Sequence, residues 1–428
     1  METFMEFFSF QHPNVKYVVL GTVLLSISSS IVGCFTFVKK KSLVGDVVSH
    51  AVLPGICISF ILSGSKDPFV LILGAFVSGW LSILIMDKIV QNTKIKEDAA
   101  TAFSLSVFFG IGILLLTFIQ HSGNAAQSGL DTFLFGKAAA LVGDDLIAFG
   151  IVALIVIVLV FVFYKEFKLI SFDVEFAKVI GLQTRQLEFV LTSITVLAVV
   201  TGIQAVGVVL MAAMLISPAA AARFWTNNFQ RMILLSALFG IIAGVSGAYI
   251  SFATPAMPTG PWMVMILSGI ALFSFFFAPR KGILVRQYKR YQIQRMLLEE
   301  NLLKAFYKID EKTDFESGAV FTDNRHLSKN FSPTQLQKGL KALRKNGYVT
   351  ASRSGWRLTN EGFEKGKRIT RLHRLWELYL TKYLRIAPDH VHEDAETIEH
   401  VITPELEARL QKLLDFPTSD PHSSTIPQ

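Results

Sequence analysis

Long apolar runs separated by short polar segments dominate the first two-thirds of the chain. A helix needs about 20 apolar residues to cross the hydrocarbon core of a bilayer. Nine runs reach or approach that length, near residues 15–38, 46–62, 68–87, 99–119, 146–164, 187–204, 206–222, 230–250 and 262–278. The pattern predicts an all-α polytopic membrane protein with about nine transmembrane helices. Two short spans share the stretch 187–222, which is expected to turn near Gly202–Gly207.

The basic residues between the spans predict the orientation, because Lys and Arg accumulate in cytoplasmic loops. Alternation through nine spans places twelve of the fifteen basic residues of this region on one side of the membrane. These are Lys39, Lys40, Lys41, Lys88, Lys94, Lys96, Lys165, Lys168, Lys178, Arg185, Arg223 and Arg231. The prediction is a multi-pass protein of the bacterial inner (plasma) membrane with its N-terminus outside and its C-terminus in the cytoplasm.

Composition changes after residue 279 and predicts a separate soluble tail. Residues 1–279 hold 15 Lys/Arg and 14 Asp/Glu, whereas residues 280–428 hold 26 and 19. The basic excess therefore belongs to the tail, which suggests nucleic acid or anionic lipid as a partner. We expect a transmembrane domain over 1–279, a linker helix over 280–295, a winged helix-turn-helix over 296–360 and a further helical region over 361–428.

The segment 322–349 reads as helix, turn, helix and strand, with the first helix near 324–329. Ser332 is expected to cap the second helix and Pro333 to begin it. Strands at 347–350 and 356–359 would form the wing. A basic second helix is typical of a recognition helix in a DNA major groove, and a protein-interaction module of the same fold is the alternative. The candidate DNA contacts are Ser332, Thr334, Gln335, Lys338 and Lys341.

One loop, from Lys165 to Glu188, is longer than the other loops between spans. It predicts a short helix, Val174 to Ile180, capped by Asp173 and stopped by Gly181. The residues alone leave two interpretations open. The helix is either a connector or a docking segment for a partner protein.

Asp46 and His50 are ionisable residues inside a predicted span, where such residues are costly and usually functional. They are four apart and so share one helix face. A carboxylate oxygen and an imidazole nitrogen suit a divalent ion such as Mn²⁺, Zn²⁺ or Fe²⁺, and Pro54 frees backbone carbonyls one turn further on. The alternative is that Asp46 caps the helix and His50 is a satisfied core residue.

Four segments together resemble one family. SFDVEFAKVIGL in the long loop is similar to the coupling-loop motif of the manganese/zinc/iron class of ABC transporter permeases. KSLVGDVVSHAVLPGI, TFLFGKAAAL and GVVLMAAMLISPAAAARF match the same class in the same order. The resemblance implies a homodimeric membrane subunit with a separate ATPase subunit and an extracytoplasmic metal-binding receptor. It places Asp46 and His50 in the transport path. It assigns ATPase coupling to Asp173, Phe176, Ala177 and Gly181.

The tail carries a second resemblance. RLHRLWELYLTKYL and VHEDAETIEHVITPELEARL resemble the metal-binding and dimerisation region of the diphtheria-toxin-repressor family, over about 296–428. By that resemblance His373, Glu377 and His392 form one metal site, and Glu396, Glu399 and His400 form a second. The sequence departs from the family at Asn301 and Lys304, where the first helix of the domain is expected to supply ligands to the second site.

These patterns predict a permease subunit that imports a divalent transition metal (Mn, Fe or Zn) and carries a cytoplasmic metal-responsive domain. Two alternatives for the tail are a DNA-binding repressor, tethered or released, and a purely structural dimerisation module. No GxxxxGK[ST] loop is present, so this chain is expected to bind no nucleotide. No nucleophile–base constellation indicates an enzyme.

Overall fold

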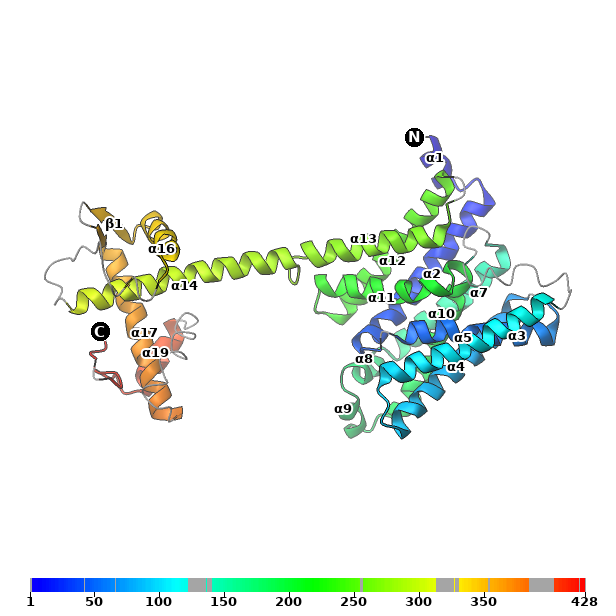
Figure 1. The fold of residues 1–428 in the computed structure, drawn as a ribbon, viewed down its shortest axis with the longest axis horizontal. Coiled ribbons are helices and arrows are strands. Elements are labelled where there is room, and N and C mark those ends of the chain that lie inside the picture. The colour runs from blue at the N-terminus through cyan, green and yellow to red at the C-terminus, as the bar shows by residue number, and fades with distance from the viewer. Residues whose placement is uncertain are drawn as a thin grey trace. The chain divides into compact units, whose positions relative to one another are not determined.

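A computed structural model describes most of the chain. The described residues are 2–41, 43–65, 67–121, 136, 141–254, 257–312, 327, 331–352, 355–384, 404–422 and 424–427. The chain divides into two compact units, Met1–Arg286 and Gln287–Gln428 (Figure 1).

The first unit is built from helices. They are α1 (Glu2–Phe8), α2 (Pro13–Val38), α3 (Val44–Ser63), α4 (Pro68–Asn92), α5 (Glu97–His121), α7 (Gly143–Val162), α8 (Tyr164–Phe172), α9 (Val174–Val179), α10 (Thr184–Val206), α11 (Val208–Trp225), α12 (Phe229–Ala253) and α13 (Thr259–Phe277). Eight helices of the described part are long and apolar enough to cross a membrane, namely α2, α3, α4, α5, α7, α10, α12 and α13. The polytopic membrane architecture predicted from the apolar runs is confirmed.

The remaining predicted span, 206–222, falls on α11. α11 has 18 residues, Val208–Trp225, and is not among those eight helices. α10 ends at Val206 and α11 begins at Val208, with Gly207 at φ +91° between them. The predicted turn near Gly202–Gly207 is confirmed, and glycine suits it because positive φ is strained for other residues.

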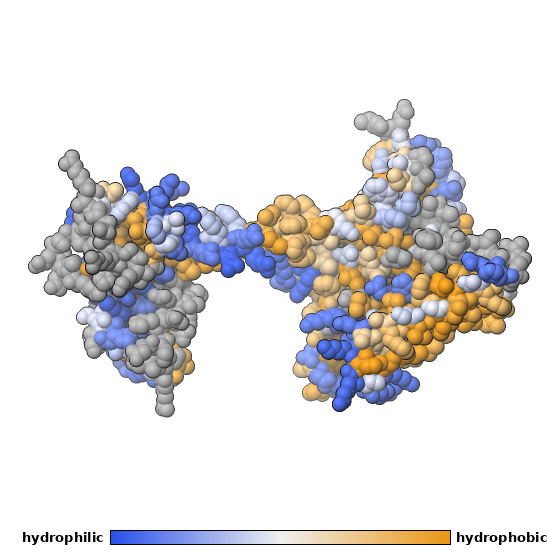
Figure 2. All heavy atoms as spheres, viewed as in Figure 1, coloured by the Kyte–Doolittle hydropathy of each residue, from blue (hydrophilic) through white to orange (hydrophobic). Residues whose placement is uncertain are grey.

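Packing in this unit is centred on α2, which contacts α7, α10, α11 and α12. α3 packs mainly on α4 and α5. At Gly55 of α3 an added Cβ would lie 2.1 Å from the carbonyl oxygen of Gly74 in α4, so the two backbones meet directly. Leu73, Leu81 and Phe103 leave apolar surface on α4 and α5 exposed, as Figure 2 shows, which is the surface expected to face lipid.

The second unit contains α14 (Ile283–Lys312), α16 (Pro333–Lys345), β1 (Val349–Ser352), β2 (Gly355–Leu358), α17 (Asn360–Leu384) and α19 (Pro404–Leu413). Its core gathers Leu302, Leu303 and Phe306 of α14 with Leu343, Val349 and Ile369. α14 runs unbroken through residues 295 and 296, so the predicted linker helix and the start of the predicted tail domain lie on one helix.

α16 begins as predicted, with Ser332 as its cap and Pro333 at its first position. β1 and β2 pair antiparallel with Val349 opposite Leu358. β1 starts two residues later than expected because Gly347 turns at φ +78° and the N–H of Tyr348 still bonds to the carbonyl of Leu343. Of the predicted first helix, 324–329, the structure describes residue 327 alone.

Candidate functional site

Asp46 and His50 lie one turn apart on α3, and both are half-buried. The His50 ring packs edge-on against Phe109 of α5, with 5.0 Å between ring centroids. Within the described residues, His50 Nδ1 is buried and has no hydrogen-bond partner. Leaving a buried polar atom unpaired costs about 1–3 kcal/mol. A ligand that used this nitrogen would remove that cost.

The carboxylate of Asp46 is also available. The cap of α3 is Leu43, which makes no side-chain capping bond. For the described part of the chain, the structure records no hydrogen bond that Asp46 accepts from a backbone N–H or from His50. The capping role considered from the sequence therefore has no hydrogen bond behind it, and the carboxylate oxygens stay open to a cation.

Pro54 lies inside α3 and changes the hydrogen bonding of a backbone carbonyl near the same turn. Proline has no N–H, so the carbonyl of His50, four residues earlier, lacks its usual helical donor. An imidazole nitrogen, a carboxylate and a backbone carbonyl are thus offered from two adjacent turns. This mixture of nitrogen and oxygen donors suits first-row divalent metals.

The long loop forms α8 and α9 with the predicted cap and stop. Asp173 Oδ1 accepts a hydrogen bond of 2.9 Å from the N–H of Phe176. Gly181 has φ +86°, and its N–H bonds to the carbonyl of Lys178. Each end of the short helix is therefore closed by local hydrogen bonds.

The four residues predicted to couple this loop to an ATPase divide into two groups. Asp173 and Gly181 close the ends of α9, and Ala177 is completely buried. Ala177 therefore packs the loop against its own unit and presents no surface to a partner. The exposed apolar side chains are Phe176 (52%), Val179 (84%) and Ile180 (52%). The sequence reasoning missed Val179 and Ile180, although apolar residues three and four positions after Phe176 mark a shared helix face.

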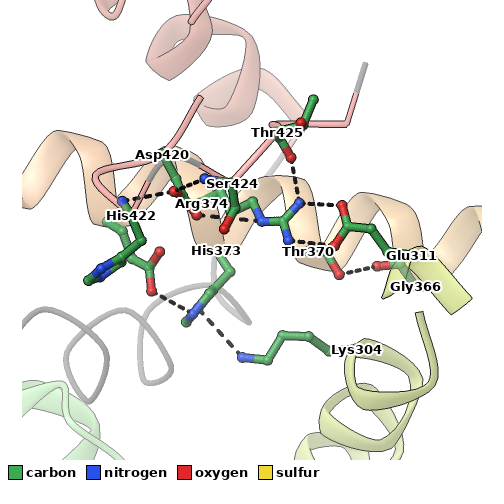
Figure 3. Close-up of polar contacts among 11 residues, drawn as sticks. Lys304, Glu311, Gly366, Thr370, His373, Arg374, Asp420, His422, Ser424 and Thr425 are labelled. Atoms are coloured by element: carbon green, nitrogen blue, oxygen red, sulfur yellow. Dashed lines mark hydrogen bonds and ion pairs between the residues drawn. The ribbon is translucent and has the colours of Figure 1, made fainter. Parts of the chain in front are cut away.

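In the tail, His373 and Glu377 lie one turn apart on α17 and bond to each other. His373 Nε2 is 2.8 Å from Glu377 Oε1, and both side chains are buried. Lys304 of α14 is also buried, and its Nζ lies 3.5 Å from His373 Nδ1 (Figure 3). Asn301 Oδ1, one turn earlier on α14, is buried without a hydrogen-bond partner in the described part of the chain.

These tail residues do not fit a metal ion as they stand. The other predicted ligands, His392, Glu396, Glu399 and His400, lie outside the described residues. Within the described ranges, no group of three or more His, Cys, Asp or Glu side chains could hold a metal. The second ring nitrogen of His373 lies 3.5 Å from the ammonium nitrogen of Lys304, which repels cations.

Comparison with known proteins assigns two parts of the chain to families. Residues 11–278 match the ABC 3 transport family. The chain belongs to this family. Residues 359–428 match the iron dependent repressor, metal binding and dimerisation domain. The family assignment makes the chain a transport subunit rather than an enzyme.

Relatives of this ABC 3 chain include two curated proteins. The chain is 39% identical to the manganese transport system membrane protein MntC of Bacillus subtilis over 378 residues, which is 88% of this chain and 86% of that protein. It is 43% identical to the zinc transport system membrane protein TroC of Treponema pallidum over 291 residues, 68% of this chain and 97% of that protein.

A solved structure supports the fold of the membrane unit. PsaBC from Streptococcus pneumoniae, in complex with Fab, aligns with a TM-score of 0.58 and 33% identity. The alignment covers 65% of this chain and 97% of that chain. Both predicted family resemblances, to the permease class and to the metal-dependent repressors, are confirmed.

Another buried charge network ties α17 of this ABC 3 chain to α14 and to the C-terminal segment. Both terminal nitrogens of Arg374 bond to the Glu311 carboxylate, at 2.8 and 2.6 Å. Arg374 Nε lies 3.6 Å from Asp420 Oδ2. Burial alone would lower the pKa of Arg374, but Glu311 and Asp420 outweigh burial and raise that pKa. The guanidinium is therefore a permanent charge inside the tail.

The candidate DNA-contact residues sit at the start and along one face of α16. All five are exposed: Ser332, Thr334, Gln335, Lys338 and Lys341. Gln335 Oε1 accepts the N–H of Ser332 at 2.9 Å and so completes the cap. Lys338 and Lys341 line a hollow of about 810 Å³ between α16 and α14, together with Arg295. The face is basic and accessible.

Proposed function

We propose that this chain is the membrane subunit of an importer for a divalent transition metal, Mn²⁺, Zn²⁺ or Fe²⁺, and that Asp46 and His50 bind the cargo on its path. The observation that carries the proposal is the buried His50 Nδ1, which lacks a partner among the described residues and lies one turn from an available carboxylate. The names of MntC and TroC favour manganese or zinc as the cargo.

Metal uptake by the assembled transporter tests this proposal. His50→Gln should abolish uptake of Mn²⁺ or Zn²⁺ while leaving membrane insertion intact, because glutamine keeps the size of the side chain and removes the ligating nitrogen. His121→Gln is the matched control, since His121 is exposed at the end of α5 and its Nδ1 bonds to the carbonyl of Thr117. Normal uptake by both His50→Gln and Asp46→Asn would refute the proposed path.

We infer that α9 docks into a separate ATPase subunit through Phe176, Val179 and Ile180. Its support is an exposed apolar face on a loop whose ends are closed by Asp173 and Gly181. Val179→Asp should reduce co-purification of the ATPase without affecting folding, because Val179 is 84% exposed. Ala177→Asp should instead destabilise the loop itself, since Ala177 is buried. Wild-type recovery of the ATPase with Val179→Asp would exclude this docking face.

The proposed topology counts α11 as a ninth span and so places the N-terminus outside and the tail in the cytoplasm of the bacterial inner membrane. Its support is the distribution of basic residues in the loops. A reporter enzyme fused after Arg280 should be active on the cytoplasmic side alone. Activity outside would require an even number of spans. A receptor outside the membrane and a second copy of the chain complete the proposed assembly.

For the tail we propose a winged-helix and dimerisation module. α16 followed by the β1–β2 hairpin, and the match over 359–428, support it. DNA binding through α16 is the second candidate, favoured by its exposed lysines. The full chain in detergent should then bind duplex DNA with a steep salt dependence, which Lys338→Ala should reduce. A metal response through His392, Glu396, Glu399 and His400 stays a prediction.

A further inference from the structure

The cluster of Lys304, His373 and Glu377 joins α14 to α17 deep inside the tail. The three side chains are 5%, 2% and 1% exposed. A buried charge is tolerated when it is paired and hydrogen-bonded. An ammonium lies at one nitrogen of the His373 imidazole and a carboxylate at the other, so the ring already has a cation of the protein's own beside it.

The direction of each hydrogen bond follows from the chemistry of the donors. An ammonium group has three donors and no acceptor. Its contact with His373 Nδ1 therefore makes that nitrogen the acceptor. A neutral imidazole that accepts at Nδ1 carries its proton on Nε2, which then donates to Glu377 Oε1 at 2.8 Å. Both ring nitrogens are thus engaged in one tautomer.

A metal ion needs a free lone pair on a histidine nitrogen. In this tautomer Nε2 is protonated, and the lone pair of Nδ1 points at a cation. Metal binding at Nε2 would require the proton on Nδ1, which cannot then accept from Lys304. The ion would also lie close to a buried ammonium, where repulsion is weakly screened.

We propose that the Lys304 ammonium is the resident cation of this cluster, which holds α14 against α17 and excludes divalent metal from His373 and Glu377. This inference goes beyond transport, because it assigns the tail a closed state that needs no metal at this position. A sequence comparison that counts His373 and Glu377 as ligands would assign a metal site where the chain has a hydrogen-bonded cluster of its own side chains.

Neighbouring contacts also hold α14 against α17 without a metal ion. At Gly366 of α17, an added Cβ would lie 3.1 Å from the carbonyl oxygen of Leu303, so the two helices cross in close contact. Further along the same pair of helices, Arg374 holds Glu311 with two hydrogen bonds. Lys304 lies between Leu303 and Glu311 on α14, and His373 lies between Gly366 and Arg374 on α17. The interface is therefore held by packing and fixed charges along its length.

The test measures metal bound by the purified full chain carrying His50→Gln, which removes the proposed transport site. After incubation with Mn²⁺ or Zn²⁺ and gel filtration, bound metal is counted with and without His373→Gln. Equal amounts are expected, because His373 binds no metal while Lys304 is present. Loss of one metal equivalent on His373→Gln, with an unchanged gel-filtration profile, would overturn the proposal.

A gain-of-binding variant provides the second measurement, since misfolding cannot create a site. Lys304→Glu replaces the ammonium with a carboxylate on a side chain one bond shorter. The expected result is one additional metal equivalent, lost again in Lys304→Glu/His373→Gln, together with thermal stabilisation by metal that the parent chain does not show. Failure of Lys304→Glu to gain metal while the chain stays folded would count against Lys304 as the excluding residue.

Discussion

Asp46–His50 in the membrane unit and His373–Glu377 in the tail are the same motif, an acid and a histidine four residues apart on one helix. Their surroundings differ completely. His50 Nδ1 has no partner within the described residues, and Pro54 leaves a carbonyl free beside it. His373 bonds to Glu377 on one nitrogen and faces Lys304 on the other.

The comparison shows that an acid and a histidine at this spacing can bind a metal ion. Whether they do so depends on the next side chain packed against the histidine. Where the neighbour is an aromatic ring, Phe109, the imidazole is oriented but keeps its lone pair. Where the neighbour is a buried ammonium, Lys304, the lone pair accepts a hydrogen bond from that cation. Asp46 and His50 are suited to bind an ion in transit, whereas His373 and Glu377 are suited to hold two helices together.

The largest expected effect comes from removing one of the two charged groups that flank His373, Lys304 and Glu377. Glu377→Leu leaves the Lys304 ammonium buried without that carboxylate and should destabilise the tail by about 3–5 kcal/mol. Lys304→Met/Glu377→Leu should recover most of the loss, because removing both charges leaves no desolvation penalty. Hydrogen exchange of the α17 backbone measures both. A double variant as unstable as Glu377→Leu alone would show that Lys304 and Glu377 do not stabilise each other through their charges.

At Asp46 and His50, substitution should change metal uptake and leave the stability of the membrane unit unchanged. Asp46→Asn should lower the initial rate of Mn²⁺ or Zn²⁺ uptake by about tenfold or more, since the amide carries no charge for the cation. Asp67→Asn is the control, because Asp67 is an exposed cap of α4 that asparagine can replace. Asp46→Asn/His50→Gln should be no worse than the poorer single variant, because both residues serve one site.

A smaller effect is expected at Pro54. Pro54→Ala restores the helical hydrogen bond to the carbonyl of His50 and so withdraws one oxygen from the path. Uptake should fall by a few-fold while the helix becomes more stable. Pro68→Ala is the control, since Pro68 begins α4, where a missing N–H costs nothing. Unchanged uptake in Pro54→Ala would remove the carbonyl from the list of ligands.

The smallest effect concerns Asp310, a tail carboxyl on α14. Burial raises its pKa, and the charge of Arg357 opposes that shift. A raised pKa means that the folded state holds the proton more tightly, so this residue destabilises the tail at neutral pH and less so as pH falls towards that pKa. Asp310→Asn should slightly raise the thermal stability of the tail at pH 7. The gain should shrink on acidification, and a gain that grows would contradict the sign.

Much of the fold followed from local patterns. The apolar runs predicted the spans because a bilayer imposes one length on every crossing helix. The Asp173 cap, the Gly181 stop and the Ser332–Pro333 start were predictable because each depends on neighbours a few residues away. The α10–α11 turn followed from a glycine within an apolar stretch too long for one span.

The features that could not be predicted from the sequence are contacts between residues far apart in the chain. Lys304 and His373 are 69 positions apart, so their contact is invisible to periodicity. Burial of Ala177 depends on how α9 packs against its own unit, and a six-residue helix has too few residues to reveal its inner face. The Arg374–Glu311 pair joins two helices and had no local signature.

The close approach of α3 and α4 has a mechanical consequence. Their backbones touch at Gly55 and Gly74, and the hydroxyl of Ser78 donates to the carbonyl of Ala51, beside His50. Against α5, by contrast, α3 meets Gly112 through the side chain of Leu53, with no backbone-to-backbone contact at this glycine. The α3–α4 hairpin should therefore travel as one rigid piece that carries the ligand pair and slides along α5. A cross-link within the hairpin should leave uptake intact, whereas one between α3 and α5 should arrest it.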